Sequence, residues 1–225
     1  MESGLSESGD AQSRGALDAA LRRRWGWLPY RVIAGFALLA CGVAVLCDIV
    51  MWFLVEGYNP LAQTISELGA GPHHEIQDTG IVVFVVGVLS LTLGLVLRGE
   101  GDGKSWAVRG AFLLLGADIA LIALWNEYGD GDVGGPVIHR YLLMALYLLV
   151  PAVLWLGTSV PPARGDRLAK IGKAAALAWL PFAPLFYVVP ETVNGAYERL
   201  LALVMLGAVA AAAWPLYQKP QEGAQ

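Results

Sequence analysis

Six long apolar runs, separated by polar connections, make up most of the chain. A bilayer core of about 30 Å is crossed by about 20 residues of helix, so each run is long enough to span it. Only a helix or a closed barrel satisfies its backbone polar groups in lipid, and unbroken runs of this length are helical. The pattern therefore predicts an all-α polytopic membrane protein, a bundle of six transmembrane helices. The predicted helices are Tyr30–Val55, Ile81–Leu97, Val108–Trp125, Ile138–Leu156, Ala169–Val189 and Arg199–Leu216.

The fifth run differs from the others because it contains Pro181 and Pro184. Each proline removes a backbone N–H donor and its ring clashes with the preceding turn, so we expect a kink in this helix. A kinked helix can open space inside a bundle.

The composition agrees with a membrane protein. Hydrophobic residues make up 56% of the chain and charged residues 15%, whereas a soluble domain has about 25% charged residues. No basic stripe is interleaved with aromatic residues, so we expect no nucleic-acid partner. We divide the chain into a disordered cytoplasmic tail (1–25), a transmembrane domain (26–217) and a short cytoplasmic tail (218–225), because only the middle part carries the apolar pattern.

The distribution of Lys and Arg predicts the orientation. Thirteen of the fifteen basic residues fall in the N-terminal flank, the second and fourth connections and the C-terminal tail; the two exceptions are Arg140 and Arg199. By the positive-inside rule, both termini are cytoplasmic. We therefore expect a multi-pass protein of the cell membrane, with the connection Glu56–Asp78 on its outer side.

Carboxylates on or just below the outer side are the first candidates for chemistry. Asp48 and Asp118 interrupt two apolar runs, each seven residues before the predicted helix end, so they lie at similar depths about 10 Å below it. Ionisable residues inside a membrane usually face the interior of the bundle. Buried carboxyls can keep their proton and donate it, although two acids bonding neighbouring helices would look the same. Our candidate catalytic acids are Asp48, Asp118, Glu56 and Glu127.

Aromatic and polar residues near the same level are candidates for substrate binding. Trp52 follows Asp48 by four residues, so the two share a helix face. Aromatic faces stabilise cations, and an acid beside an aromatic lining is what carbocation chemistry requires. The candidate binding residues are Trp52, Trp125, Tyr147, Ser66, Asn126 and His139.

The three histidines permit a different interpretation. His73, His74 and His139 with a nearby acid would supply enough ligands for a catalytic zinc. No spacing such as H-E-x-x-H supports this site, so zinc is the alternative and no cofactor is our primary expectation. The segment TISELG lacks the G-x-S-x-G spacing of a nucleophile elbow, so the sequence does not favour a Ser66 nucleophile served by His139.

Three short motifs carry a resemblance to a known family. Pro60, Ile65, Ser66, Leu68 and Gly69 match a loop of the form P-x-x-x-x-I-S-x-L-G. His139 opens the fourth helix, and a G-x-x-[EQ]-R-L start of the last helix is matched by Gly195, Glu198, Arg199 and Leu200. Across about Tyr30–Trp214 the chain resembles the bacterial and archaeal membrane family called domain of unknown function 998 (DUF998). It is also distantly similar to DRAM and Frag-type six-helix proteins, some of which serve lipid remodelling. The resemblance implies the six-helix fold and no particular reaction.

Three functions remain open at this point. The first is an intramembrane enzyme that acts on a lipidic or isoprenoid substrate by general-acid chemistry, such as terpene cyclisation. The second is a metal-dependent lipid hydrolase that uses the histidines and an acid. The third is a non-catalytic lipid-binding or scaffold protein. The expected partners are a lipidic small molecule and membrane lipids.

Overall fold

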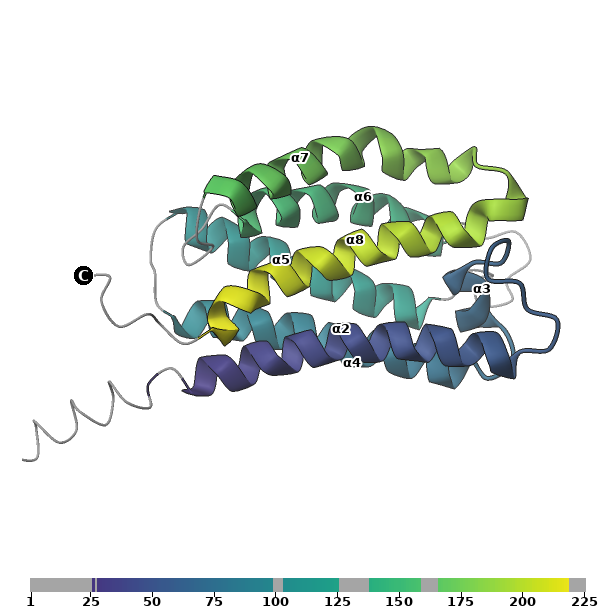
Figure 1. Ribbon diagram of the computed structural model, residues 1–225, viewed down its shortest axis with the longest axis horizontal. Helices are drawn as coiled ribbons and strands as arrows, with labels where there is room; N and C mark the ends of the chain where they lie inside the picture. Colours follow the sequence, from purple (N-terminus) through teal and green to yellow (C-terminus); the bar gives the residue numbers. More distant parts are fainter. Residues whose placement is uncertain (1–25, 27, 99–102, 126–137, 159–165, 219–225) are drawn as a thin grey trace, which may run out of the picture.

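The computed structural model describes residues 26, 28–98, 103–125, 138–158 and 166–218, and all secondary structure in these ranges is helical (Figure 1). The helices run along a common long axis, and α3 is a short exception at one end (Figure 1). We call this end the α3 end. The elements are α2 (Leu28–Leu54), α3 (Ile65–Ala70), α4 (His74–Leu97), α5 (Gly103–Leu124), α6 (Ile138–Gly157), α7 (Asp166–Phe182), the 3₁₀ helix η1 (Ala183–Tyr187) and α8 (Glu191–Tyr217).

Five of the described helices are long and apolar enough to cross a membrane: α2, α4, α5, α6 and α8. Their outward surfaces carry large exposed hydrophobic side chains, such as Phe53 and Leu148. In water such surfaces would be costly, but in lipid they are not. The all-helical membrane architecture predicted from the apolar pattern is therefore confirmed.

The predicted fifth run is divided in two. Helix α7 stops at Phe182 and the chain continues as η1, with Pro184 in the first turn of that 3₁₀ helix. Proline has no N–H to donate to the carbonyl four residues back, so the α-helical ladder ends there. We expected a kink within one helix; the α-helix instead ends at Phe182 and continues as a 3₁₀ helix, and α7 is not among the five helices above.

Several helix starts were predicted too late, and two of them differ by seven or more residues. Helix α4 begins at His74 instead of Ile81, and α8 begins at Glu191 instead of Arg199. In both cases the first two turns are polar, because they contact the connection between α2 and α4 and not lipid. The apolar pattern reports only the lipid-facing and core-facing part of each helix.

The connection between α2 and α4 is folded against the bundle. Thr64 caps α3 through a capping box: it accepts from the Glu67 backbone N–H, and the Glu67 side chain accepts from the Thr64 N–H. Such a box satisfies two backbone donors that a helix start leaves free. Leu68 is 2% exposed and anchors α3 on the bundle.

Gly195 sets the distance between this connection and α8. A Cβ atom at Gly195 would lie 2.0 Å from the carbonyl oxygen of Gln63, so only glycine allows the approach. The Gly195 N–H donates to the Ala62 carbonyl at 3.1 Å, and the Ala196 N–H donates to the Leu61 carbonyl at 2.9 Å. The start of the last helix is thus docked on the first connection.

Candidate functional site

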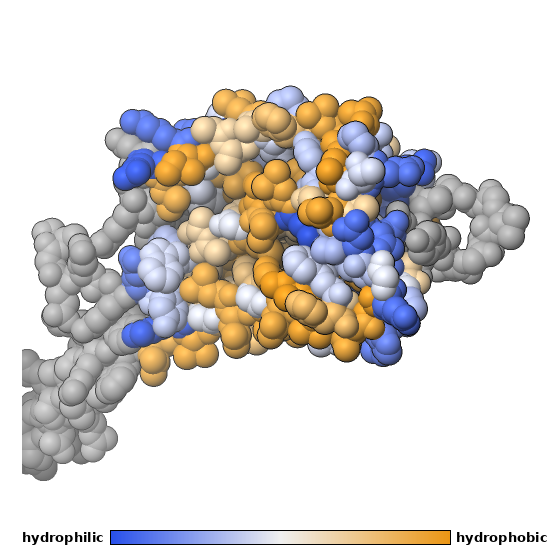
Figure 2. Space-filling view, turned by 45° about the vertical axis from the view of Figure 1, so that its right-hand side comes forward, coloured by the Kyte–Doolittle hydropathy of each residue, from blue (hydrophilic) through white to orange (hydrophobic). Residues whose placement is uncertain are grey.

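A cavity of about 420 Å³ lies inside the bundle near the α3 end. Residues of every described helix contribute to its wall, and most of them are aliphatic or aromatic. Figure 2 shows hydrophobic residues at mid-length and hydrophilic residues toward both ends, including the α3 end. The polar part of the wall is formed by Asp48, Ser66, Gln77, Asp78, His139, Glu198 and Arg199.

The first polar group, which we call the Arg199 centre, is built around the Arg199 guanidinium. Its Nε and Nη2 donate to the two carboxylate oxygens of Asp48 at 3.0 and 2.9 Å. Nη1 donates to the carbonyl oxygens of Pro60 and Gln63, both at 2.9 Å, and of Gly195 at 3.0 Å. Nη2 also donates to the Tyr58 hydroxyl. Every N–H group of this guanidinium therefore has an acceptor.

The Arg199 centre is a buried ion pair that joins α2, the first connection and α8. The two charged side chains are 11% and 12% exposed. The guanidinium carbon also lies 5.3 Å from the centroid of the Trp52 ring, and Trp52 Nε1 donates to Asp48 at 3.2 Å. Both oxygens of Asp48 accept from guanidinium N–H groups, so the contacts favour a structural role for Asp48 over the proton-donor role expected from the sequence.

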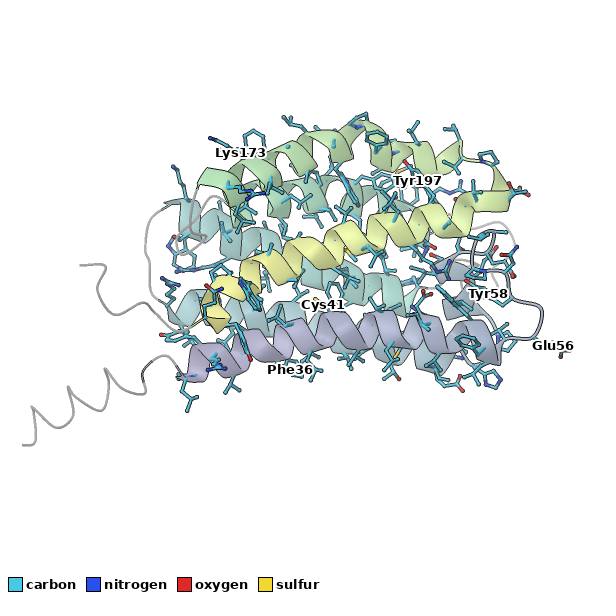
Figure 3. The ribbon with its side chains drawn as sticks, viewed as in Figure 1. Phe36, Cys41, Glu56, Tyr58, Lys173 and Tyr197 are labelled. Carbon is cyan, nitrogen blue, oxygen red and sulfur yellow. The ribbon has the colours of Figure 1, made fainter. Side chains whose placement is uncertain are left out.

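Tyr58 completes the Arg199 centre from the connection. Its hydroxyl donates toward the carbonyl oxygens of Gln63 and Thr64, at 2.9 and 3.1 Å. Burial raises the pKa of this hydroxyl to about 12, against the lowering effect of Arg199. Tyr58 therefore remains neutral over the physiological pH range. Figure 3 shows both residues in the connection, with Tyr58 on the bundle side and Glu56 pointing away from the bundle.

The second polar group, which we call the Ser66 centre, consists of Ser66, His139 and Glu198. Ser66 Oγ lies 3.1 Å from His139 Nε2 and donates to Glu198 Oε1 at 2.9 Å. His139 Nδ1 lies 2.8 Å from the carbonyl oxygen of Trp125. Since a carbonyl can only accept, Nδ1 carries a proton and a neutral His139 presents the Nε2 lone pair to Ser66.

The Ser66 centre has fewer protons than hydrogen-bond contacts. A serine hydroxyl has one hydrogen, but both a neutral His139 and an ionised Glu198 would accept it. The second oxygen of Glu198 already accepts from the Ile65 backbone N–H. One additional proton, on the histidine or on the glutamate, satisfies both contacts. The centre is thus arranged to take up and pass on a proton.

Of the other acids predicted from the sequence, Asp118 and Glu56 are not part of the cavity wall. Asp118 is 6% exposed, and one of its oxygens is buried without a hydrogen-bond partner among the described residues. Glu56 is exposed in the connection. Asn126 and Glu127 lie outside the described residues.

Two of the predicted aromatic residues line the cavity, and a third contributes its backbone. Trp52 and Tyr147 are in the wall, and Tyr147 packs edge-on against Tyr187 with ring centroids 6.0 Å apart. Trp125 acts through its carbonyl oxygen, which holds His139.

The three histidines do not converge. His74 is exposed at the start of α4 and its Nδ1 lies 2.8 Å from Asp78, while His139 is buried at the start of α6. His73 is exposed and has a left-handed backbone with φ of 61°. Within the described ranges, no three His, Cys, Asp or Glu side chains are grouped so that they could hold a metal ion. The geometry therefore offers no support for the zinc alternative.

Comparison with known proteins adds one relationship. The family described as protein of unknown function (DUF998) matches residues 38–215, which is most of the chain. The chain belongs to this family. No curated protein and no solved structure gives a match.

The motifs that resembled DUF998 in the sequence all lie at the two polar centres. Pro60 and Gly195 present carbonyl oxygens to Arg199. Ser66 and His139 are within 3.1 Å of each other although they are 73 residues apart in the chain.

Glu198 and Arg199 were not among our candidate site residues. The E-R pair of the last DUF998 motif is the signal that points to them. Because the helix was predicted to begin at Arg199, this residue was counted only as one of the two basic residues on the outer side. It actually lies two turns inside α8.

Proposed function

We propose that the protein binds a lipidic amphiphile in the cavity and modifies it by acid–base chemistry at the Ser66 centre. The observation that carries this proposal is the position of Ser66 Oγ, between a histidine nitrogen and a carboxylate oxygen on the wall of a largely apolar cavity. A concave, mainly apolar site with a few convergent polar groups is the usual form of a small-molecule site. The apolar wall suits a hydrocarbon chain, and the polar end suits its head group.

The membrane arrangement that goes with this proposal has six spans and cytoplasmic termini in the cell membrane. Helix α7 and η1 together cover Asp166–Tyr187 and would form the sixth span. The α3 end would face outward, because the basic connections lie at the other end. In support, Figure 3 shows Lys173 at the end of the bundle opposite Tyr58.

Acid–base chemistry was expected from the sequence, but different residues would perform it. Glu198 and His139 both contact the Ser66 hydroxyl at the cavity. Asp48, in contrast, is paired with Arg199. Cyclisation of an isoprenoid chain has less support than a reaction at the Ser66 centre. The Trp52 ring, which was expected to shelter a carbocation, already carries the Arg199 guanidinium.

The test begins with the identity of the bound molecule. The full-length protein is purified in lipid nanodiscs, and the amphiphile retained after delipidation is identified by native mass spectrometry. Ala202 lines the cavity, so Ala202→Trp is expected to displace the amphiphile. Leu200→Trp is the matched control, because Leu200 is 57% exposed on the same helix and outside the cavity wall.

The chemistry is tested with the identified amphiphile. His139→Gln and Glu198→Gln are expected to retain it and to slow its conversion, as followed by mass spectrometry of the extracted lipid. Equal retention by Ala202→Trp and Leu200→Trp would show that the cavity is not the binding site. Unchanged conversion in both amide variants would rule out the Ser66 centre as the reactive group.

A further inference from the structure

The Ser66 centre has the geometry of an activated nucleophile. A serine becomes nucleophilic when a general base lies within hydrogen-bond reach and a third group orients the base. Here His139 Nε2 lies 3.1 Å from Ser66 Oγ, and the Trp125 carbonyl holds the opposite nitrogen at 2.8 Å. The carbonyl takes the orienting position that a carboxylate occupies in a Ser-His-Asp triad.

Both members of the pair are held in place by the fold. Ser66 lies in the first turn of α3, whose start is capped by Thr64 and whose Ile65 N–H is bound by Glu198. His139 is 4% exposed at the start of α6. A reactive pair held by such surrounding contacts does not need to be ordered at each turnover.

The charges around the pair restrict the substrate. All N–H groups of Arg199 are already bonded to Asp48, Tyr58 and three carbonyl oxygens. Arg199 therefore has no donor to spare for a phosphate, and Glu198 places an acceptor beside Ser66. An anionic group at the reacting position would meet repulsion without compensation. A neutral carbonyl group avoids this cost.

We propose that Ser66 is a covalent nucleophile and that the substrate is an uncharged carboxylic ester with a long hydrocarbon chain. This inference rests on the proposed function and specifies its reaction. Glu198 is a positioning residue: its carboxylate contacts Ser66 Oγ, and its negative charge favours the positive charge that develops on His139 when the histidine takes up the hydroxyl hydrogen.

The reaction balances with these residues alone plus water. The Ser66 hydroxyl turns its hydrogen from Glu198 Oε1 to His139 Nε2, and Oγ bonds to the ester carbonyl carbon as this proton passes to Nε2. The alcohol then leaves with that proton, and the acyl group remains on Ser66. Water, or another alcohol, attacks the acyl-serine and gives its proton to Nε2. The carboxylic acid or new ester departs, and Ser66 Oγ regains the proton.

The test uses an alkyl fluorophosphonate, an uncharged probe that reacts with activated serines and loses fluoride. The full-length protein in nanodiscs is incubated with the probe and the adduct is located by peptide mass spectrometry. We expect one adduct, on Ser66. Ser66→Ala should remove it, and His139→Gln should slow labelling by at least about 100-fold. Ser90→Ala is the matched control and should label like the parent, because Ser90 is outside the cavity wall.

Several results would overturn the inference. An unlabelled parent protein, an adduct elsewhere, or labelling that His139→Gln leaves unchanged would each do so. Adduct mapping on the parent protein decides the matter even where a variant folds poorly. If labelling fails while the amphiphile is still bound and converted, only the nucleophile proposal is wrong. If the amphiphile is not bound at all, the proposed function fails as well.

Discussion

Two adjacent residues of α8 anchor two polar centres with opposite properties. Arg199 has an acceptor for every N–H group, and its partner Asp48 is held by two of them. Glu198 belongs to a centre in which one hydroxyl hydrogen lies between two acceptors. A group whose donors and acceptors are all paired gains no hydrogen bond when a proton moves, whereas a group with an unpaired acceptor does. In our proposal the Arg199 centre stabilises the fold and the Ser66 centre carries the reactivity.

The largest expected effect is that of Arg199→Gln on stability. The substitution leaves the Asp48 carboxylate buried without its cation, and breaking a buried ion pair in this way costs about 3–5 kcal/mol. The free energy of unfolding, measured by denaturant titration in micelles, should fall by this amount. Arg140→Gln is the control, because Arg140 is an exposed arginine at the same end of the bundle. Adding Asp48→Asn should restore part of the loss. Equal stability of the two single variants would contradict the assignment.

Gly195→Ala should have the broadest effect, because it disturbs both centres. The new Cβ would lie 2.0 Å from the Gln63 carbonyl oxygen, so α8 and the connection must separate. Overpacking costs about 1–3 kcal/mol, and both centres would be distorted together. Gly207→Ala is the control, since nothing lies within 4 Å of a Cβ there. In Gly195→Ala, but not in Gly207→Ala, the rate of fluorophosphonate labelling and the temperature of unfolding should both fall. A fall in only one of them would show that Gly195 does not support both centres.

Tyr58→Phe should weaken the Arg199 centre without touching the Ser66 centre. It removes an acceptor of the guanidinium, and a hydrogen bond to a charged group contributes about 1.5–3 kcal/mol. The parent has a further pH dependence, because the pKa of Tyr58 is raised from 10.0 to about 12 by folding. Its stabilising contribution is complete below pH 10 and is lost as the pH rises toward 12. Unfolding curves between pH 9 and pH 12 should therefore converge for the two proteins; a constant difference would contradict this.

Glu198→Gln should have the smallest effect on stability and a clear effect on rate. Glutamine can still accept from the Ile65 N–H and can donate to Ser66 Oγ, so stability should change by less than about 1 kcal/mol. Without the carboxylate charge beside His139, labelling of Ser66 should slow about tenfold, equivalent to about 1.4 kcal/mol of transition-state stabilisation. A large loss of stability at an unchanged rate would reverse the roles of the two centres.

The sequence was sufficient for the helices and insufficient for the centres. Apolar runs and Pro184 report on local backbone and lipid contact, so the spans and the break after Phe182 could be predicted. Asp48 was correctly predicted to face the interior of the bundle, because a charged residue facing lipid would be costly. Its partner was missed, because the pairing joins residues 151 apart and depends on how α2 and α8 pack.

Ser66 and His139 show the same limit. Each was selected as a binding residue, but nothing in the spacing of TISELG indicated that a histidine from α6 would reach it. The short helix α3, which turns Ser66 toward the cavity, has too few residues to show a periodic pattern. The family motifs carried the missing information, since all of them lie at the two centres.

The position of Glu198 and Arg199 on the last helix has a consequence for biosynthesis. As the chain is inserted into the membrane, α2, α3 and α6 are made before α8, so Ser66 and His139 are present while the α3 connection still lacks the contacts that dock it. The contacts that dock the connection beside Ser66 therefore form only after α8 has been made. Until then Asp48 lacks its Arg199 partner, and an ionisable residue without a partner is costly inside a bilayer.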